Sequence, residues 1–394
     1  MLAAALVGAA VSVAAQDLDI DTRQGVVEAA QAEKVKTLQP YTQTSLEHLM
    51  VRLQDILDYR TVKWHPFFQS AAHGSGFPIG IGYVEHVSPF NFVDLRGSYS
   101  TYGYKLAEAE FVAPRLFERR GQLSVAGGWK NATQVGFFGM GPDSSVNDRT
   151  NYAFKEGYGS ALLTVFPTRR MLMLRGGFEV TQWSPDAARG SFPPVEAAYT
   201  PATLPGLGST ITYAHTQGTI GFDWRQSPGY ARRGGYYAVT GHDYHDNDKQ
   251  FGFREVSYEA IQHFPILRDT WVISLRGLAE TAYTRDGQDV PYFLLPHLGG
   301  GSTLRGFDSW RFRDRNRLLL QAEWRIMANR FMDTAVFYDA GKVAARPADL
   351  DFDNMQHDYG FGVRFHTPFM TALRVEVARS NEQTRLVVST GPSF

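Results

Sequence analysis

The sequence predicts an all-β protein, a sixteen-stranded antiparallel transmembrane β-barrel with a short N-terminal helical segment. Three observations predict this fold. Apolar and polar residues alternate with period two from residue 61 to the C-terminus. The alternating segments number sixteen, an even number, as in bacterial barrels formed by one chain. Their connections fall into a short class and a long class, as a barrel in an asymmetric membrane requires.

Composition excludes several other classes of protein. After the N-terminus, no run reaches the roughly eighteen apolar residues that a transmembrane helix needs, so a helical membrane protein is excluded. The net charge of -1 gives no field for attracting nucleic acid. The chain has no cysteine, which excludes disulfides, a thiolate nucleophile and a lipid-anchoring cysteine. The aromatic content of 13% favours β-structure.

The chain is expected to have three segments. Residues 1–15 are apolar and carry small residues at Val13 and Ala15, which predicts a signal peptide; a short buried helix is the alternative. Residues 16–60 predict a helical segment, broken at Pro40. Its second helix has an apolar stripe formed by Leu46, Leu49, Leu53 and Leu57. Residues 61–394 are the expected barrel domain.

The expected strands are defined by the faces they present. In the clearest one, Leu318, Leu320, Ala322, Trp324 and Ile326 alternate with Arg317, Gln321, Glu323 and Arg325. Such strongly charged faces, repeated in many segments, favour a barrel over a soluble sandwich. The predicted strands are 62–70, 77–87, 92–102, 104–113, 120–132, 151–165, 170–183, 209–226, 235–246, 252–264, 270–283, 315–327, 331–342, 357–366, 371–380 and 384–394. The short connections, among them 88–91, 167–169, 328–330 and 367–370, are expected to face the periplasm together with both termini.

The connection from Thr284 to Asp314 is too long to be a simple turn, and loops of this length are usually functional. Its centre is rich in glycine, which lets the backbone fold tightly, and leads into Arg305, Gly306 and Phe307. Arginine offers a planar fork that matches a carboxylate. This loop is therefore the main candidate for a functional element.

The Arg305-Gly306-Phe307 sequence resembles the signature of the BamA/TamA-type outer-membrane assembly and translocation barrels, the bacterial surface antigen barrel domain. The resemblance covers roughly residues 62 to 394. It implies a bacterial outer-membrane protein whose sixth external loop folds into the barrel. Typical members carry POTRA domains before the barrel, and residues 16–60 are too short for one, so this chain is expected to be a short form without them.

In that family the loop arginine meets acidic side chains on the next two strands, one of them within a Phe-x-Asp-x-Gly motif. This sequence has that motif at Phe337, Asp339 and Gly341, and it has Glu323 on the preceding strand. The resemblance therefore implies a charge-assisted pairing of Arg305 with Asp339, Glu323 or both.

The two end strands are expected to form a weak seam, which in the family is the proposed lateral gate. Pro66 in the first strand, and Gly391 and Pro392 in the last, weaken or remove ladder hydrogen bonds. The alternative is that Gly391 and Pro392 simply end the strand. Phe394, as a terminal aromatic, suits an aromatic girdle at the membrane interface and resembles the recognition signal of outer-membrane proteins.

Other motifs point to no cofactor, metal or catalytic site. His242, Asp243, His245, Asp246 and Asp248 are interpreted as a solvated hairpin, because His242 and His245 point to opposite faces of a regular strand. The glycine-rich loop lacks the lysine of a phosphate-binding loop, and no Gly-x-Ser-x-Gly nucleophile elbow occurs.

Three functions remain open at this stage. The first is a non-enzymatic barrel that assembles, inserts or translocates membrane proteins or lipids. Its partners would be outer-membrane lipids and nascent outer-membrane proteins or a separate periplasmic partner. The second is a passive or plugged pore or structural barrel. The third is a barrel-based lipid hydrolase, for which no paired serine and histidine can be identified.

Overall fold

The computed structural model describes residues 26–27, 29–31, 33–34, 63–168, 171–267 and 269–394. The chain divides into two compact units, Met1–Leu49 and Met50–Phe394. The described residues of the first unit are helical. The expected signal peptide and most of the expected helical segment lie outside the described residues, and their boundaries stay predictions. Within the described residues, no helix is long and apolar enough to cross a membrane.

The second unit contains one sixteen-stranded sheet in which every strand pairs antiparallel with its neighbour in the chain. Its strands are β1 (Trp64–Phe67), β2 (Pro78–His86), β3 (Phe92–Ser100), β4 (Lys105–Leu116), β5 (Gly121–Phe137), β6 (Thr150–Val165), β7 (Leu172–Asp186), β8 (Ile211–Asp223), β9 (Gly234–Asp246), β10 (Phe253–Ile266), β11 (Trp271–Thr284), β14 (Asn316–Asn329), β15 (Met332–Ala344), β16 (Gln356–His366), β17 (Thr371–Ser380) and β18 (Thr384–Ser389). The connections carry η1 (Val146–Asp148), η2 (Val195–Ala197), η3 (Tyr292–Leu294), η4 (Pro347–Asp349) and a small ladder of β12 (His297–Leu298) with β13 (Phe312–Arg313).

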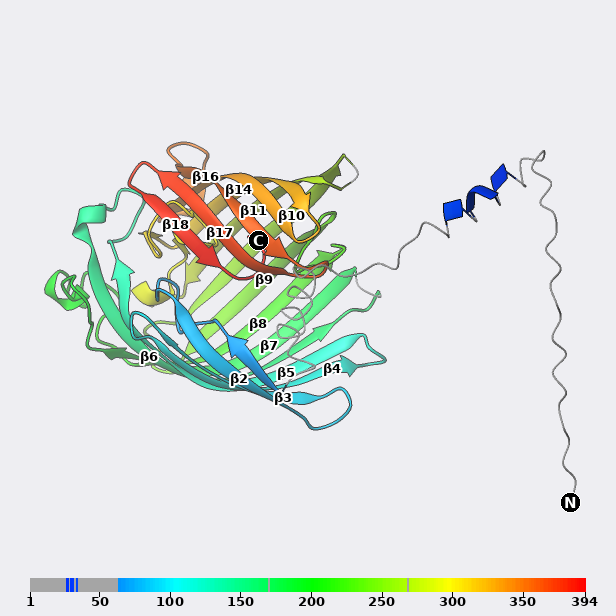
Figure 1. Ribbon diagram of the computed structural model, residues 1–394. Helices are drawn as coiled ribbons and strands as arrows, with labels where there is room; N and C mark the ends of the chain where they lie inside the picture. Colours follow the sequence, from blue (N-terminus) through cyan, green and yellow to red (C-terminus); the bar gives the residue numbers. More distant parts are fainter. Residues whose placement is uncertain (1–25, 28, 32, 35–62, 169–170, 268) are drawn as a thin grey trace, which may run out of the picture. The chain divides into compact units, whose positions relative to one another are not determined.

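Each of the sixteen predicted strands corresponds to one strand of this sheet, which confirms the predicted fold class. Figure 1 shows the sheet curling from β2 and β3, through β6 to β9, round to β17 and β18. Long connections gather at one end of the strands, the long-loop end, and mostly short ones at the other, the short-turn end. The alternation of connection lengths read from the sequence therefore reflects the true course of the chain.

The two faces of the sheet differ as a membrane barrel requires. On β15, Val336 and Tyr338 are exposed outward, whereas Phe337 and Asp339 are buried on the inward face. The same holds for β14, where Trp324 is exposed outward. Large apolar side chains in solvent and charged side chains in the interior would be costly in a soluble protein. In a bilayer the outward face contacts lipid, so the arrangement is favourable.

The long-loop end holds the largest apolar core of the described residues. Aromatic side chains near the ends of β5, β6, β8 and β10 pack against residues 187–210 and 285–315. Tyr292 of η3, for example, contacts Tyr152 and Phe137 with ring centroids 5.0 and 5.5 Å apart. These long connections are therefore packed elements that cover the sheet end.

β1 and β18 are the end strands of the sheet. Within the described part of the chain, no backbone hydrogen bond joins them. β1 spans only Trp64–Phe67 and includes Pro66, which cannot donate a backbone hydrogen bond. The predicted position of Pro66 in the first strand is confirmed, and the seam between the end strands is open in this structure.

Candidate functional site: a loop held against the inward wall

Residues 285–315 connect β11 to β14 and fold back over the inward face of the sheet. β12 and β13 pair to form the stem of this loop, and its tip spans residues 299–311. Gly299 has φ +108°, and a Cβ there would lie 2.2 Å from the carbonyl oxygen of Asp308. The stretch of glycines is therefore needed for the sharp reversal at the base of the tip.

Apolar side chains of the loop pack against three strands. Leu304 and Phe307 are fully buried, and the ring of Phe307 meets that of Phe312 edge to face at 5.2 Å. The complete cluster is Leu278, Leu298, Leu304, Phe307, Phe312, Leu319 and Val343. Because β11, β14 and β15 contribute three of these residues, the loop packs against an apolar surface that these strands share.

Arg305 lies at the centre of this contact and is fully buried. Its Nε and Nη2 donate to the two carboxylate oxygens of Asp339 at 2.7 and 2.8 Å, a bidentate pairing. Its Nη1 donates to Glu376 at 3.1 Å and to Glu323 at 3.4 Å. The structure thus brings Arg305 to both carboxylates expected from the sequence, with Asp339 as the main partner.

The electrostatics of Arg305 depend on these neighbours. Burial disfavours its charged form, but Asp339, Glu376 and Glu323 together raise its pKa above the ordinary value. The guanidinium group therefore stays charged at physiological pH. A buried charge of this kind contributes little net stability when paired, but it is costly when its partner is removed.

The other motif residues explain how the loop fits so closely. The guanidinium carbon of Arg305 lies 3.4 Å from the centroid of the Phe337 ring. A Cβ at Gly306 would lie 2.7 Å from the Cβ of Asp358, and one at Gly341 would lie 2.8 Å from Leu298. A larger residue at Gly306 would therefore press on the neighbouring strands, whereas one at Gly341 would require the side chain of Leu298 to move.

One buried ion cluster comprises Arg305, Asp339, Glu323, Glu376, Arg364 and Arg374. The sequence did not predict the last three of these residues as members of the site. Glu376 on β17 accepts from Arg305, from Arg364 of β16 at 2.7 Å and from Arg374 at 3.0 Å. Arg364 also donates to Glu323. The available signal was that Arg374 and Glu376 occupy alternate positions of a predicted strand and so face the same side. Nothing in that signal indicated which side chains would meet.

The comparisons with known proteins identify the family. A model of the Omp85 superfamily domain matches residues 91–392. The chain belongs to the Omp85 superfamily. It is therefore an outer-membrane β-barrel of bacteria, and the predicted kinship with BamA/TamA-type barrels is confirmed. A search of the curated proteins finds no match to this sequence.

Two solved structures are similar to this chain in fold. BamA from Haemophilus ducreyi lacking POTRA domains 1–3 matches with TM-score 0.59 and 15% identity, over 90% of this chain and 80% of that chain. CdiB from Escherichia coli matches with TM-score 0.54 and 12% identity, over 82% of this chain and 60% of that chain. At these identities the likeness concerns the fold.

The tip of the loop, residues 299–311, forms further hydrogen bonds beyond those of Arg305. Arg311 donates to Glu382, between β17 and β18, at 2.8 Å and to the carbonyl oxygen of Ser144 at 2.6 Å. The indole nitrogen of Trp310 donates to the carbonyl oxygen of His73, between β1 and β2, at 2.9 Å. The tip therefore contacts connections on both sides of the open seam.

The C-terminal residues do not lie where the sequence predicted. The last strand was expected to reach Phe394, but β18 ends at Ser389, and Gly391 and Pro392 lie beyond it. Gly391 has φ +81°, a conformation that turns the chain out of the strand direction. The alternative weighed for Gly391 and Pro392, that they end the strand, is the one observed.

As a consequence of this turn, Phe394 does not lie in an outward aromatic girdle. Its ring is parallel to that of His263, a buried residue, with centroids 6.4 Å apart. The preceding Ser393 donates to Glu323 at 2.9 Å. The tail thus returns to the ion cluster that holds the loop.

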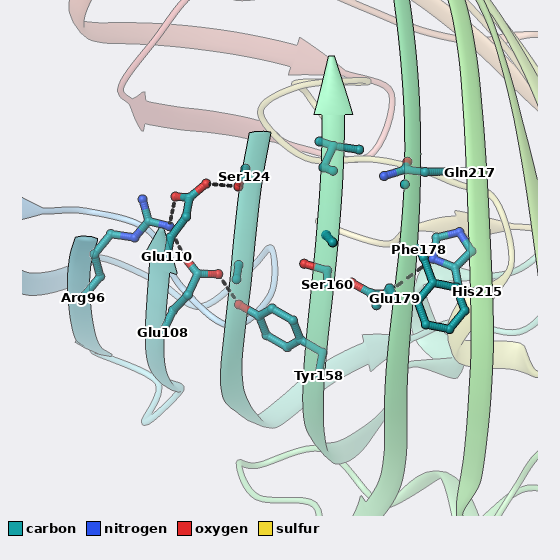
Figure 2. A pocket seen from close by; sticks show the side chains of 14 residues that line it. Arg96, Glu108, Glu110, Ser124, Tyr158, Ser160, Phe178, Glu179, His215 and Gln217 are labelled. Carbon is teal, nitrogen blue, oxygen red and sulfur yellow. Dashed lines mark hydrogen bonds and ion pairs between the residues drawn. The ribbon is translucent and has the colours of Figure 1, made fainter. Parts of the chain in front are cut away.

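The inward face of β3 to β8, opposite the wall that holds Arg305, is polar and is not covered by the tip of the loop. Figure 2 shows side chains on the consecutive strands β3 to β8 that line a polar cavity. The volume of this cavity is about 200 Å³. Arg96 pairs with Glu110 at 2.7 Å, and Glu179 lies 3.4 Å from His215. The carboxylate side chains of Glu110 and Glu179 are 22% and 29% exposed, whereas that of Glu376 is fully buried. The tip of the loop therefore covers one wall and leaves the other polar and open to water.

Proposed function

We propose that this Omp85 barrel assembles, inserts or translocates membrane proteins or lipids in the outer membrane without an enzymatic step. The loop with Arg305, Gly306 and Phe307 would act as a lock that sets how far the seam between β1 and β18 opens. A client strand would pair with an exposed strand edge while the lock is released. Nascent outer-membrane proteins, outer-membrane lipids or a separate periplasmic protein would be the partners.

One observation carries this proposal: the loop tip bonds to both flanks of the seam. Trp310 bonds to the connection between β1 and β2, and Arg311 bonds to the turn between β17 and β18. Arg385 of β18 also donates to the carbonyl oxygen of Phe307. Because one loop ties both flanks to the wall that holds Arg305, a change in its docking is coupled to the separation of the end strands.

The end strands supply the chemistry that an insertion site needs. An end strand leaves backbone donors and acceptors unpaired, and such edges recruit a further strand. β1 is short and includes Pro66, and β18 stops at Ser389, so each offers few hydrogen bonds to the other. A client with a longer edge would compete well for the free edge of β18.

A passive plugged pore is the second candidate, and the polar cavity beside Arg96 and Glu110 favours it. A wall of partly exposed charges suits the passage of water and small solutes. The two functions differ in what the cell loses without the protein. Without an assembly barrel, other outer-membrane proteins fail to reach the membrane. Without a pore, only the passage of its solutes is lost.

Depletion in the native cell, followed by profiling of outer-membrane proteins, tests the proposal. We expect a broad loss of other barrels that the unmutated gene restores and Arg305→Ala does not. Arg315→Ala is the matched control, because Arg315 lies in the same loop and forms only a half-exposed ion pair with Asp289. An unchanged profile after depletion would overturn the assembly function and leave the pore.

A further inference from the structure

The connection between β8 and β9 is an exception at the short-turn end. Residues 224–233, the strap, reach the turn between β16 and β17, although four strands separate β9 from β16 in the sheet. The backbone of Gly229 forms a parallel bridge with Met370 and accepts from Thr371 at 2.8 Å. Ser227 donates to the carbonyl oxygen of Phe369 at 2.8 Å. The strap therefore crosses the inside of the curled sheet.

An aromatic and acidic anchor fixes the strap in place. The ring of Tyr230 stacks on that of His366 at 3.8 Å, with 11° between the planes. The hydroxyl of Tyr230 donates to Asp333 at 2.7 Å, and His366 pairs with the other oxygen of Asp333 at 3.1 Å. All three side chains are buried. The strap is therefore a built part of the short-turn end.

A cavity of about 470 Å³ lies between the strap and three neighbouring turns. Its wall includes Gln226, Arg232, Met327, Asn329 and Pro368. Met327 continues the inward face of β14, since it follows the buried Arg325 by two positions. The cavity therefore lies at the short-turn end, beside the strap.

Among the residues that the structure describes, no carboxylate pairs with Arg232 in this cavity, and its guanidinium carbon lies 5.9 Å from the centroid of the Tyr230 ring. Its Nη2 contacts the sulfur of Met327 at 2.7 Å, a weak acceptor, and its Nε is buried without a hydrogen bond. Among the ion pairs of the described residues, none includes Arg232. Asp269, the acidic residue of the cavity wall, is paired with Arg233 at 2.6 Å. A half-buried guanidinium left in this state favours an incoming carboxylate or phosphate.

We propose that this cavity binds a carboxylate side chain of an acidic peptide segment that approaches from the short-turn end. Apolar atoms of Met327, Ala328 and Pro368 beside the guanidinium suit the carbon atoms of a peptide, which a small inorganic anion lacks. The inference rests on the proposed function, in which a client or partner arrives at this end, and it names the chemistry of that partner. The strap positions Arg232 as its receptor.

The test is peptide binding to the full chain in lipid nanodiscs, measured by fluorescence anisotropy. The probe is a fluorescein-labelled peptide of alternating glutamate and alanine, compared with the matched glutamine peptide. A charge-assisted hydrogen bond predicts that the glutamine peptide binds about tenfold or more weakly. Arg232→Gln should weaken the glutamate peptide to a similar degree, whereas Arg254→Gln, an exposed residue at the long-loop end, should not.

Labelling of a single introduced cysteine measures peptide binding while Arg232 stays in place. The chain has no cysteine, so Asn329→Cys and Asn247→Cys each carry one reactive group, the first in the cavity wall and the second in an exposed hairpin. The glutamate peptide should slow maleimide labelling several-fold at position 329 and not at 247. Equal binding of the two peptides, or equal protection at both positions, would overturn the inference. So would displacement by inorganic phosphate as readily as by unlabelled glutamate peptide.

Cell profiling separates this inference from the proposed function. Peptide binding that depends on Arg232, in a protein whose depletion leaves other barrels unchanged, would keep the site and overturn the assembly function. Loss of barrels on depletion, with no peptide binding, would overturn the site and keep the function.

Discussion

Replacing Arg305 by alanine should release the loop tip from the wall. Without the guanidinium, Asp339 stays buried, and among the described side chains the amide of Gln321, at 3.1 Å, still donates a hydrogen bond to it. Glu376 keeps Arg364 and Arg374. The cost therefore falls on Asp339, and an uncompensated buried charge costs about 3–5 kcal/mol. That energy shifts the equilibrium from docked to released loop by roughly two to four orders of magnitude.

Thiol labelling measures this equilibrium directly. Leu304 is fully buried in the docked tip, and Leu304→Cys would be the sole thiol of the chain. We expect slow maleimide labelling in the otherwise unmutated protein and labelling faster by about a hundredfold or more with Arg305→Ala. Arg315→Ala should leave the rate unchanged. Arg305→Met combined with Asp339→Leu should restore protection, because no buried charge is left unpaired. Equal rates with and without Arg305 would refute the reasoning.

Two further predictions concern the fit of the tip. Gly306→Ala should lower the unfolding midpoint of the barrel, measured as the temperature at which the fast-migrating folded band on a gel is replaced by the slower unfolded band. The reason is that the new Cβ would lie 2.7 Å from that of Asp358, and overpacking costs about 1–3 kcal/mol. An unchanged midpoint would contradict the close approach. Acidification should loosen the tip near Trp310, because burial lowers the pKa of His73 and of His297 below the ordinary 6.5. The released histidines take up protons as the pH falls below about 6.5, while the docked ones stay neutral, so docking weakens with falling pH. Hydrogen exchange of residues 306–312, corrected for the intrinsic effect of pH, should rise between pH 7.5 and 5; no rise would exclude this coupling.

The strands and their faces were predictable because side-chain alternation is a local property. Leu320 and Trp324 of β14 face outward and Glu323 faces inward, as their spacing requires. Register then follows from the short turns, which pair each strand with the next. The family resemblance, and not the periodicity, indicated that Arg305 would meet Asp339.

The remaining contacts depend on how the whole sheet curves. Glu376 and Glu323 lie on different strands, and only the curvature and the returning loop bring both to Arg305. Alternation gives the face of a residue but not its neighbour across the interior. The inward position of Phe394 was not predicted for a different reason. It depends on the backbone conformation of Gly391, and a glycine at that position is compatible both with a strand that continues and with one that ends.

The central claim is that a buried arginine holds the loop against the inward wall of the barrel, where it obstructs the interior. Single-channel current through the purified chain in planar bilayers tests this claim most directly. We expect small, flickering currents from the unmutated protein and larger ones from Arg305→Ala, with Arg315→Ala as the unchanged control. A large, steady current from the unmutated protein would contradict it.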